Sequence, residues 1–182
     1  MIIGLTGRNA SGKTTAGRWF VDHRGFGMDS LSDAIRYWLA DQGLPITRET
    51  LIEGGRALRR EGGPGVLAER LLARIPEGAD HVIDSIRTPG EVAALRARRD
   101  FVLLAITAPV EARYARLLAR GRAGDAASRA AFEAQERAEL VSADAAGQAL
   151  LATAALADHT VDNSGAPDAL HQALERVLSG AR

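Results

Sequence analysis

The sequence predicts an α/β fold of three layers, with helices covering both faces of a parallel sheet. Short apolar runs alternate with longer segments rich in Ala, Leu, Arg and Glu, as expected when buried parallel strands are connected by helices. The first apolar run leads into a GxxxxGK[ST] segment and then into a helical pattern, which is the context of a phosphate-binding loop. At 182 residues the chain is large enough for one domain with its own hydrophobic core.

The predicted strands are short and apolar, and the segments between them favour helix. The strands are expected at 1–6, 25–29, 81–84, 101–107 and 159–162. Pro89 and Pro109 each follow a strand, where proline suits the first turn of a helix. The helices are expected at 13–23, 31–42, 48–61, 65–74, 89–98, 109–120, 127–141, 143–157 and 167–178.

The composition limits the possible functions. The formal net charge is zero and aromatic residues make up 4%, so we expect no nucleic-acid partner. The absence of cysteine excludes disulfides and thiolate metal sites, and the four histidines lack metal-ligand spacing. No signal peptide and no apolar stretch approaching about 20 residues is present, so we expect a cytoplasmic protein without a membrane partner. Both a monomer and a homodimer are compatible with the sequence.

The candidate phosphate-binding loop contains the only lysine of the chain, Lys13, among 23 basic residues. A compact ammonium group fits inside such a loop better than a wide, planar guanidinium. The loop N–H groups and the following helix are expected to bind ATP, with Lys13 on the β- and γ-phosphates and Thr14 on Mg²⁺. Arg8 faces either phosphate or solvent. The predicted nucleotide-binding residues of the loop are Gly7, Arg8, Asn9, Ala10, Ser11, Gly12, Lys13, Thr14 and Thr15.

Further charged residues follow the predicted strands, at the edge where ligands of such sheets gather. Asp84 ends the 81–84 strand and is expected to hold Mg²⁺, although a helix-capping role is the alternative. Arg87 is expected to clamp a phosphate, or else to form a surface ion pair. Asp29 has either a catalytic or substrate role or a simple capping role, and Arg36 is expected to point toward an acceptor phosphate.

Arginines also gather in the segment after the 101–107 strand. Arg113, Arg116 and Arg120 have i, i+3, i+7 spacing on one helix face, and Arg137 lies in the next predicted helix. Arginines that close over a phosphoryl group stabilise the charge that spreads over its oxygens during transfer. Arg116, Arg120 and Arg137 are therefore predicted to act in a lid.

These features together resemble the P-loop nucleotide kinase superfamily, which includes adenylate and cytidylate kinases. The chain is most similar to an archaeal-type family related to dephospho-CoA kinase, and to the kinase-like domain of some deoxycytidylate deaminases. The resemblance covers essentially the whole chain. It rests on the loop with the strand before it and on four further runs, which are Leu58-Arg59-Arg60-Glu61-Gly62-Gly63-Pro64, Val82-Ile83-Asp84-Ser85-Ile86-Arg87 with Glu91-Val92, Arg116 through Arg122, and Val161-Asp162-Asn163-Ser164-Gly165.

The resemblance implies a five-stranded parallel sheet in the order 2-3-1-4-5, with a helical acceptor-binding insertion and a lid. It implies a single domain with a core at 1–30, 78–112 and 157–182, an acceptor-binding region at 31–77 and a lid at 113–141. It assigns Arg36, Arg59 and Arg87 to the acceptor, and Asp29 to an acceptor hydroxyl in the dephospho-CoA kinase pattern. It also implies that Asn163, Ser164 and Gly165 border the base of ATP.

The expected activity is transfer of a phosphoryl group from ATP, with Mg²⁺, to a small nucleotide-like acceptor such as a nucleoside monophosphate. The predicted catalytic residues are Lys13, Asp84, Arg87, Arg120 and Arg137. One alternative is transfer to a hydroxyl, as in dephospho-CoA kinase. The other is a regulatory module that hydrolyses nucleotide without a small-molecule acceptor.

Overall fold

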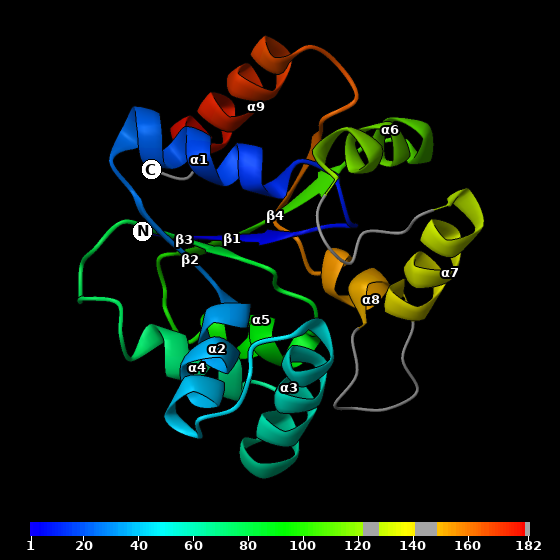
Figure 1. The fold of residues 1–182 in the computed structure, drawn as a ribbon. Helices are drawn as coiled ribbons and strands as arrows, with labels where there is room; N and C mark the ends of the chain where they lie inside the picture. Colours follow the sequence, from blue (N-terminus) through cyan, green and yellow to red (C-terminus); the bar gives the residue numbers. More distant parts are fainter. Residues whose placement is uncertain (122–127, 141–148, 181–182) are drawn as a thin grey trace.

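The fold is built on one sheet of five parallel strands. The computed structural model describes residues 1–121, 128–140 and 149–180 (Figure 1). The strand order is β2-β3-β1-β4-β5, which confirms the predicted fold class and the predicted order. The strands are β1 (Ile2–Thr6), β2 (Gly27–Ser30), β3 (His81–Asp84), β4 (Phe101–Thr107) and β5 (His159–Asp162).

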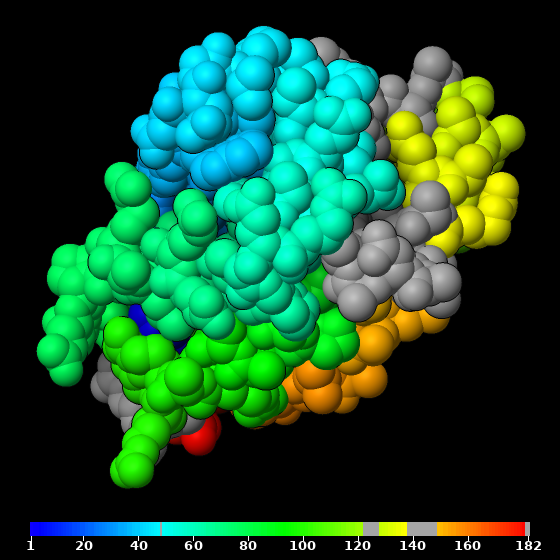
Figure 2. All heavy atoms as spheres, turned by 90° about the horizontal axis from the view of Figure 1, so that it is seen from below, coloured from blue at the N-terminus to red at the C-terminus, as the bar shows by residue number. Residues whose placement is uncertain are grey.

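Helices cover both faces of the sheet (Figure 1). On one face, α1 (Lys13–Arg24) and α9 (Pro167–Gly180) pack on Ile3, Leu5 and Leu104. On the other face, α2 (Leu31–Asp41), α3 (Arg48–Gly62), α4 (Val66–Leu72) and α5 (Pro89–Leu95) pack on Ile2 and Ile83. Figure 2 shows this second face, where the residues of α2 to α5 gather beside α7 and α8.

Three helices extend along the side of the sheet near the loop after β1. They are α6 (Val110–Arg120), α7 (Arg129–Leu140) and α8 (Leu150–Ala154). The predicted helix at 127–141 corresponds to α7, and its two end residues lie outside the described part of the chain. Of the predicted helix at 143–157, residues 143–148 lie outside the described part, α8 covers Leu150–Ala154, and the prediction was wrong for 155–157, which form a turn that begins at the C-cap.

The second strand begins two residues later than predicted, because α1 continues to Arg24 and ends at a left-handed glycine. Gly25 has a φ of 70°, and its N–H binds the carbonyls of Phe20 and Val21. Since only glycine adopts this conformation without strain, the helix end falls at this residue. The strand also continues to Ser30, so Asp29 lies inside β2 rather than at its predicted end.

Charges fix the amino end of β1. The Met1 amino group lies 2.6 Å from Asp80 and 3.2 Å from Asp100. Arg98 donates two hydrogen bonds to Asp100, at 2.9 and 2.7 Å. These bonds from Arg98 hold the pKa of the Asp100 carboxyl at about 2.

Within the described residues, no helix combines the length and the apolar character needed to cross a membrane.

Candidate functional site

The loop between β1 and α1 runs so close to the strands beside it that it requires glycine at two positions. Gly7 has a φ of 138°, and a Cβ there would lie 2.3 Å from the Ile106 carbonyl oxygen. Gly12 has a φ of 102°, and a Cβ there would lie 2.0 Å from Asn163 Nδ2. Both glycines of the GxxxxGK[ST] spacing are therefore explained by the geometry of the loop.

The loop presents donors for an anion. Gly12 is the N-cap of α1 and makes no side-chain capping bond, so no cap covers the N–H groups of the first turn. Lys13 Nζ donates to the carbonyl oxygens of Gly7 at 2.8 Å and Arg8 at 3.0 Å, which holds its ammonium across the loop. The Ser11 hydroxyl is buried and has no hydrogen-bond partner among the described residues. This arrangement fits the phosphates of a nucleotide.

Two residues are suited to hold a magnesium ion with those phosphates. Thr14 is exposed in the first turn of α1, and Asp84 ends β3, the strand beside β1. Asp84 is 8% exposed and accepts the Ser85 N–H at 2.5 Å. The structure contains no cluster of three or more His, Asp or Glu suited to a metal within its described part. A site of this kind suits Mg²⁺, which typically uses one or two protein ligands and substrate phosphates.

Asn163 and Arg116 support the loop from behind. Asn163 Nδ2 donates to the Ser11 carbonyl at 2.8 Å, and Arg116 Nη2 donates to the Asn163 carbonyl at 2.7 Å. The Ser164 hydroxyl bonds to the Asp162 carboxylate. Asn163 and Arg116, predicted to contact the nucleotide, thus bind the loop that would hold it, and Gly165 follows in the exposed turn before α9.

A buried ion pair joins α6 to α7. Neither of its residues is among the predicted site residues. Arg113 is 2% exposed and donates through both Nη atoms to Glu136, with Nη2 at 2.9 Å. Its Nε also donates to the Ala108 carbonyl at 3.0 Å. Arg8 in the loop lies 3.7 Å from the same carboxylate, so it faces Glu136 rather than solvent alone.

The other two predicted lid arginines differ in their surroundings. Arg120 Nη2 donates to Asn9 Oδ1 in the loop at 2.9 Å. Arg137 is exposed on α7. The structure therefore brings Arg116 and Arg120 of α6 to the loop, whereas Arg137 lies on the neighbouring helix.

On the β2 side, two predicted acceptor residues bind close neighbours. Asp29 Oδ2 hydrogen-bonds His81 Nε2 at 2.8 Å, and His81 is the first residue of β3 whereas Asp84 is its last. Arg36 Nη1 donates to Ser32 at 2.9 Å and to Asp33 at 2.7 Å, all within α2. Asp33 also accepts the Ser30 N–H and so forms part of the capping box at the start of α2.

Arg59 and the segment at Arg87 meet at a carboxylate. Arg59 Nη2 donates to Glu91 Oε1 at 2.6 Å, and the Arg87 N–H donates to Glu91 Oε2 at 2.8 Å. Arg59 lies on α3 and Arg87 lies between β3 and α5, so Glu91 brings together two of the predicted acceptor residues.

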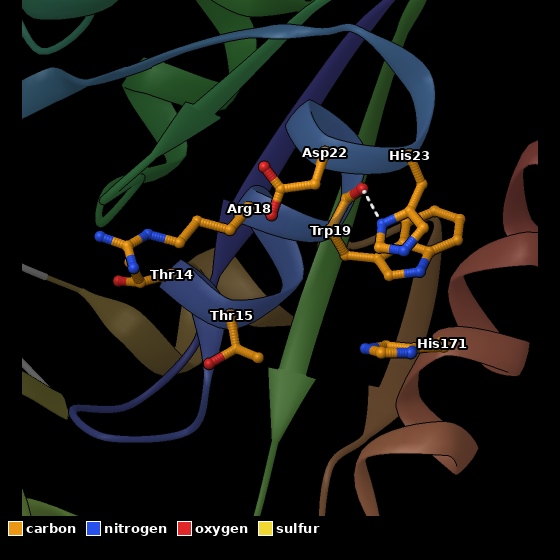
Figure 3. A pocket seen from close by; sticks show the side chains of 7 residues that line it. All are labelled: Thr14, Thr15, Arg18, Trp19, Asp22, His23 and His171. Atoms are coloured by element: carbon orange, nitrogen blue, oxygen red, sulfur yellow. Dashed lines mark hydrogen bonds between the residues drawn. The ribbon is translucent and has the colours of Figure 1, made fainter.

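A shallow hollow runs along α1 from the loop toward α9 (Figure 3). Thr14 and Thr15 line its end nearest the loop, and Arg18 extends toward Thr14. The opposite end holds His23 stacked on Trp19, with ring centroids 5.4 Å apart. The polar end of the hollow is thus continuous with the phosphate-binding loop.

Comparisons with known proteins show similar chains over most of the length. A UPF0200 protein from Pyrococcus horikoshii is 31% identical over 188 aligned positions, covering 98% of this chain and 96% of the relative. One from Pyrococcus furiosus is 31% identical over 186, with coverages of 98% and 96%. A UPF0200/UPF0201 protein from Archaeoglobus fulgidus is 30% identical over 97% of this chain, which spans 54% of that relative. No family model matches the chain.

Solved structures share the fold. Shikimate kinase from Aquifex aeolicus has a TM-score of 0.61 and 15% identity, with 99% of this chain and 97% of that one covered. TT1252 from Thermus thermophilus has a TM-score of 0.60 and 22% identity, with the same coverages. A sugar kinase from Janibacter has a TM-score of 0.55 and 19% identity, covering 98% and 92%. The fold is therefore that of P-loop kinases.

Proposed function

The chain belongs to the UPF0200 family, and we propose that it transfers a phosphoryl group from ATP to a small, nucleotide-like acceptor. The acceptor that we propose carries its own phosphate, as a nucleoside monophosphate does. The proposal depends most on one observation, the loop in which Lys13 is held across the carbonyls of Gly7 and Arg8 at an uncapped helix start. A donor site of this kind suits the β- and γ-phosphates of ATP.

On the donor side, the proposed roles follow from where the residues lie. The loop N–H groups and Lys13 bind and orient the phosphates, and Thr14 with Asp84 would hold Mg²⁺, which neutralises phosphate charge when bound. Arg120 contacts Asn9 and so lies beside the loop, where its charge would stabilise the transferred group. Arg116 would keep the loop in shape through its bond to the Asn163 carbonyl.

On the acceptor side, we propose that Arg36, Arg59 and Arg87 bind the acceptor within and beside the region 31–77. The lid would be 113–141, with Arg137 closing from α7, and the core would be 1–30, 78–112 and 157–182. Arg36 would have to exchange its bonds within α2 for the acceptor phosphate. Arg36 gives up little when it does so, since its side chain is 42% exposed and an ion pair within one helix contributes about 0.3–0.5 kcal/mol.

A phosphate acceptor is favoured over a hydroxyl by the surroundings of Asp29. A hydroxyl acceptor benefits from a carboxylate base, and the dephospho-CoA kinase pattern assigns that base to Asp29. Here the Asp29 backbone lies opposite Ile83, but its carboxylate reaches back to His81 at the start of β3, away from Asp84 at the end of that strand. A phosphate acceptor is already ionised at neutral pH and needs no such base.

The test is a coupled assay of ADP formation with ATP, Mg²⁺ and a panel of acceptors. The panel contains nucleoside monophosphates, dephospho-CoA and, because two fold neighbours are named for them, shikimate and simple sugars. We expect ADP formation that depends on a nucleoside monophosphate and is lost in Lys13→Met. ADP formation at the same rate without any acceptor would instead support the nucleotide-hydrolysing module.

Two substitutions separate the kinds of acceptor. For a phosphate acceptor, Arg36→Met should raise the acceptor KM about tenfold or more, because a charge-assisted bond is lost. Asp29→Asn should then change kcat less than about threefold, because no proton needs to be removed. The opposite pattern, with Asp29→Asn abolishing turnover and Arg36→Met active, would assign a hydroxyl acceptor.

A further inference from the structure

Glu91 has a buried carboxylate that connects two parts of the proposed acceptor site. Its side chain is 0% exposed. Oε1 accepts from Arg59 Nη2 at 2.6 Å, and Oε2 accepts the N–H groups of Arg87 at 2.8 Å and Thr88 at 3.1 Å. One carboxylate therefore binds α3 and the start of α5 at the same time.

This arrangement exceeds what a helix cap requires. In a capping box, one side-chain oxygen at the third helical position binds the N-cap N–H, as Glu91 does for Thr88. The box at the start of α2 does the same with Asp33, whose other oxygen binds Arg36 on the same helix. The second oxygen of Glu91 instead reaches a residue 32 positions away, on a different helix.

Burial makes this connection rigid. The Arg59 side chain is 9% exposed, and a buried carboxylate or guanidinium that loses its charged partner carries a large desolvation cost. The two side chains therefore hold one another in place, whereas the Asp33–Arg36 pair, with side chains 29% and 42% exposed, costs much less to separate. The structure thus sets Arg59 and the Arg87 backbone in a fixed relation.

We propose that Glu91 is a positioning residue that holds Arg59 and the Arg87 segment as one preorganised unit for the anionic group of the acceptor. This inference rests on the proposed kinase function. Because a preorganised site loses less freedom when it binds, disturbing Glu91 should weaken acceptor binding and leave the ATP site in the loop after β1 intact.

The test compares Glu91→Gln with the wild type in acceptor kinetics and in ATP binding. Glutamine has the same shape and can still cap α5, but it lacks the charge that holds Arg59. The acceptor KM should rise about tenfold or more with kcat within about threefold, as expected when binding alone is weakened. The ATP Kd, measured by calorimetry without acceptor, should stay within about twofold. Glu53→Gln, an exposed position on α3, is the matched control and should change neither quantity.

A second variant covers the case in which Glu91→Gln does not fold. Arg59→Met combined with Glu91→Gln removes both charges, so no unpaired charge stays buried and stability should recover. Its acceptor KM should remain raised. An unchanged KM in either folded variant, or an ATP Kd that rises as much as the KM, would overturn the positioning role while leaving the kinase proposal intact. A wild-type protein without acceptor-dependent ADP formation would overturn both proposals.

Discussion

The buried pair between Arg113 and Glu136 allows a quantitative prediction about how α7 is held. Glu136→Gln removes the charge that both Nη atoms of Arg113 contact, and leaves a guanidinium that is 2% exposed. Breaking a buried pair by removing one partner costs about 3–5 kcal/mol. Arg113 keeps its bonds to the carbonyls of Ala108 and Asn9, at 3.0 and 3.4 Å, so the lower end of that range is expected.

The expected loss is therefore about 3 kcal/mol in the free energy of unfolding, or roughly 6–12 °C in Tm for a chain of this size. Urea denaturation at pH 7 measures the free energy, and hydrogen exchange measures the protection of α7. If the pair holds only α7, exchange in Arg129–Leu140 should rise while the other helices stay protected.

The matched control lies on the same helix. Glu133 pairs with Arg129 at 2.8 Å with side chains 42% and 44% exposed, so Glu133→Gln should change stability by less than about 0.5 kcal/mol. Equal stability of Glu136→Gln and Glu133→Gln, together with unchanged protection of α7, would show that the buried Arg113–Glu136 pair does not hold α7 in place.

Two further predictions concern the loop and the end of the sheet. Gly12→Ala should cost at least about 2 kcal/mol, from its left-handed backbone and from the clash with Asn163, and should abolish triphosphate binding in calorimetry. Gly25 also has a positive φ, but the space around it is open. Gly25→Ala should therefore cost about 1 kcal/mol of stability without loss of triphosphate binding, and equal effects of the two substitutions would contradict the clash at Gly12. Asp100 has a folded pKa of about 2, below its ordinary 3.8, so its stabilisation is present above pH 4 and is lost as pH falls toward 2. Asp100→Asn should be less stable by under about 1 kcal/mol at pH 7 in urea denaturation and should approach the wild type as the pH falls below 2, whereas a constant difference across that range would contradict the assignment.

Much of the fold could be predicted from the sequence because its signals are local. The apolar runs specify the strands, and the spacing of Gly7, Gly12 and Lys13 specifies the loop, since each depends on backbone geometry over a few residues. Thr88 and Glu91 likewise have the spacing of a capping box, which indicates the start of α5. The strand order came from the resemblance to known kinases and agrees with the structure.

The candidate site was only partly predictable, because its charged groups choose partners far away in the chain. Arg113 has the helix spacing of its neighbours, and nothing in the sequence marks it as the one that is buried against Glu136. The sequence is compatible with Arg8 facing either phosphate or solvent, and the structure gives it another neighbour, the same Glu136. Such pairings are decided when helices pack and water is removed.

Hydrophobic periodicity and glycine spacing act over short distances, so the amino-acid order is enough to specify a parallel α/β domain with a phosphate-binding loop. Which partner each carboxylate binds depends on how the elements pack together. Asp29 binds His81 at a separation of 52 residues, and Glu91 binds Arg59 at a separation of 32. The physical reason is that a buried charge must find an opposite charge or a hydrogen bond within a few ångströms, and only the packed fold determines which group that is.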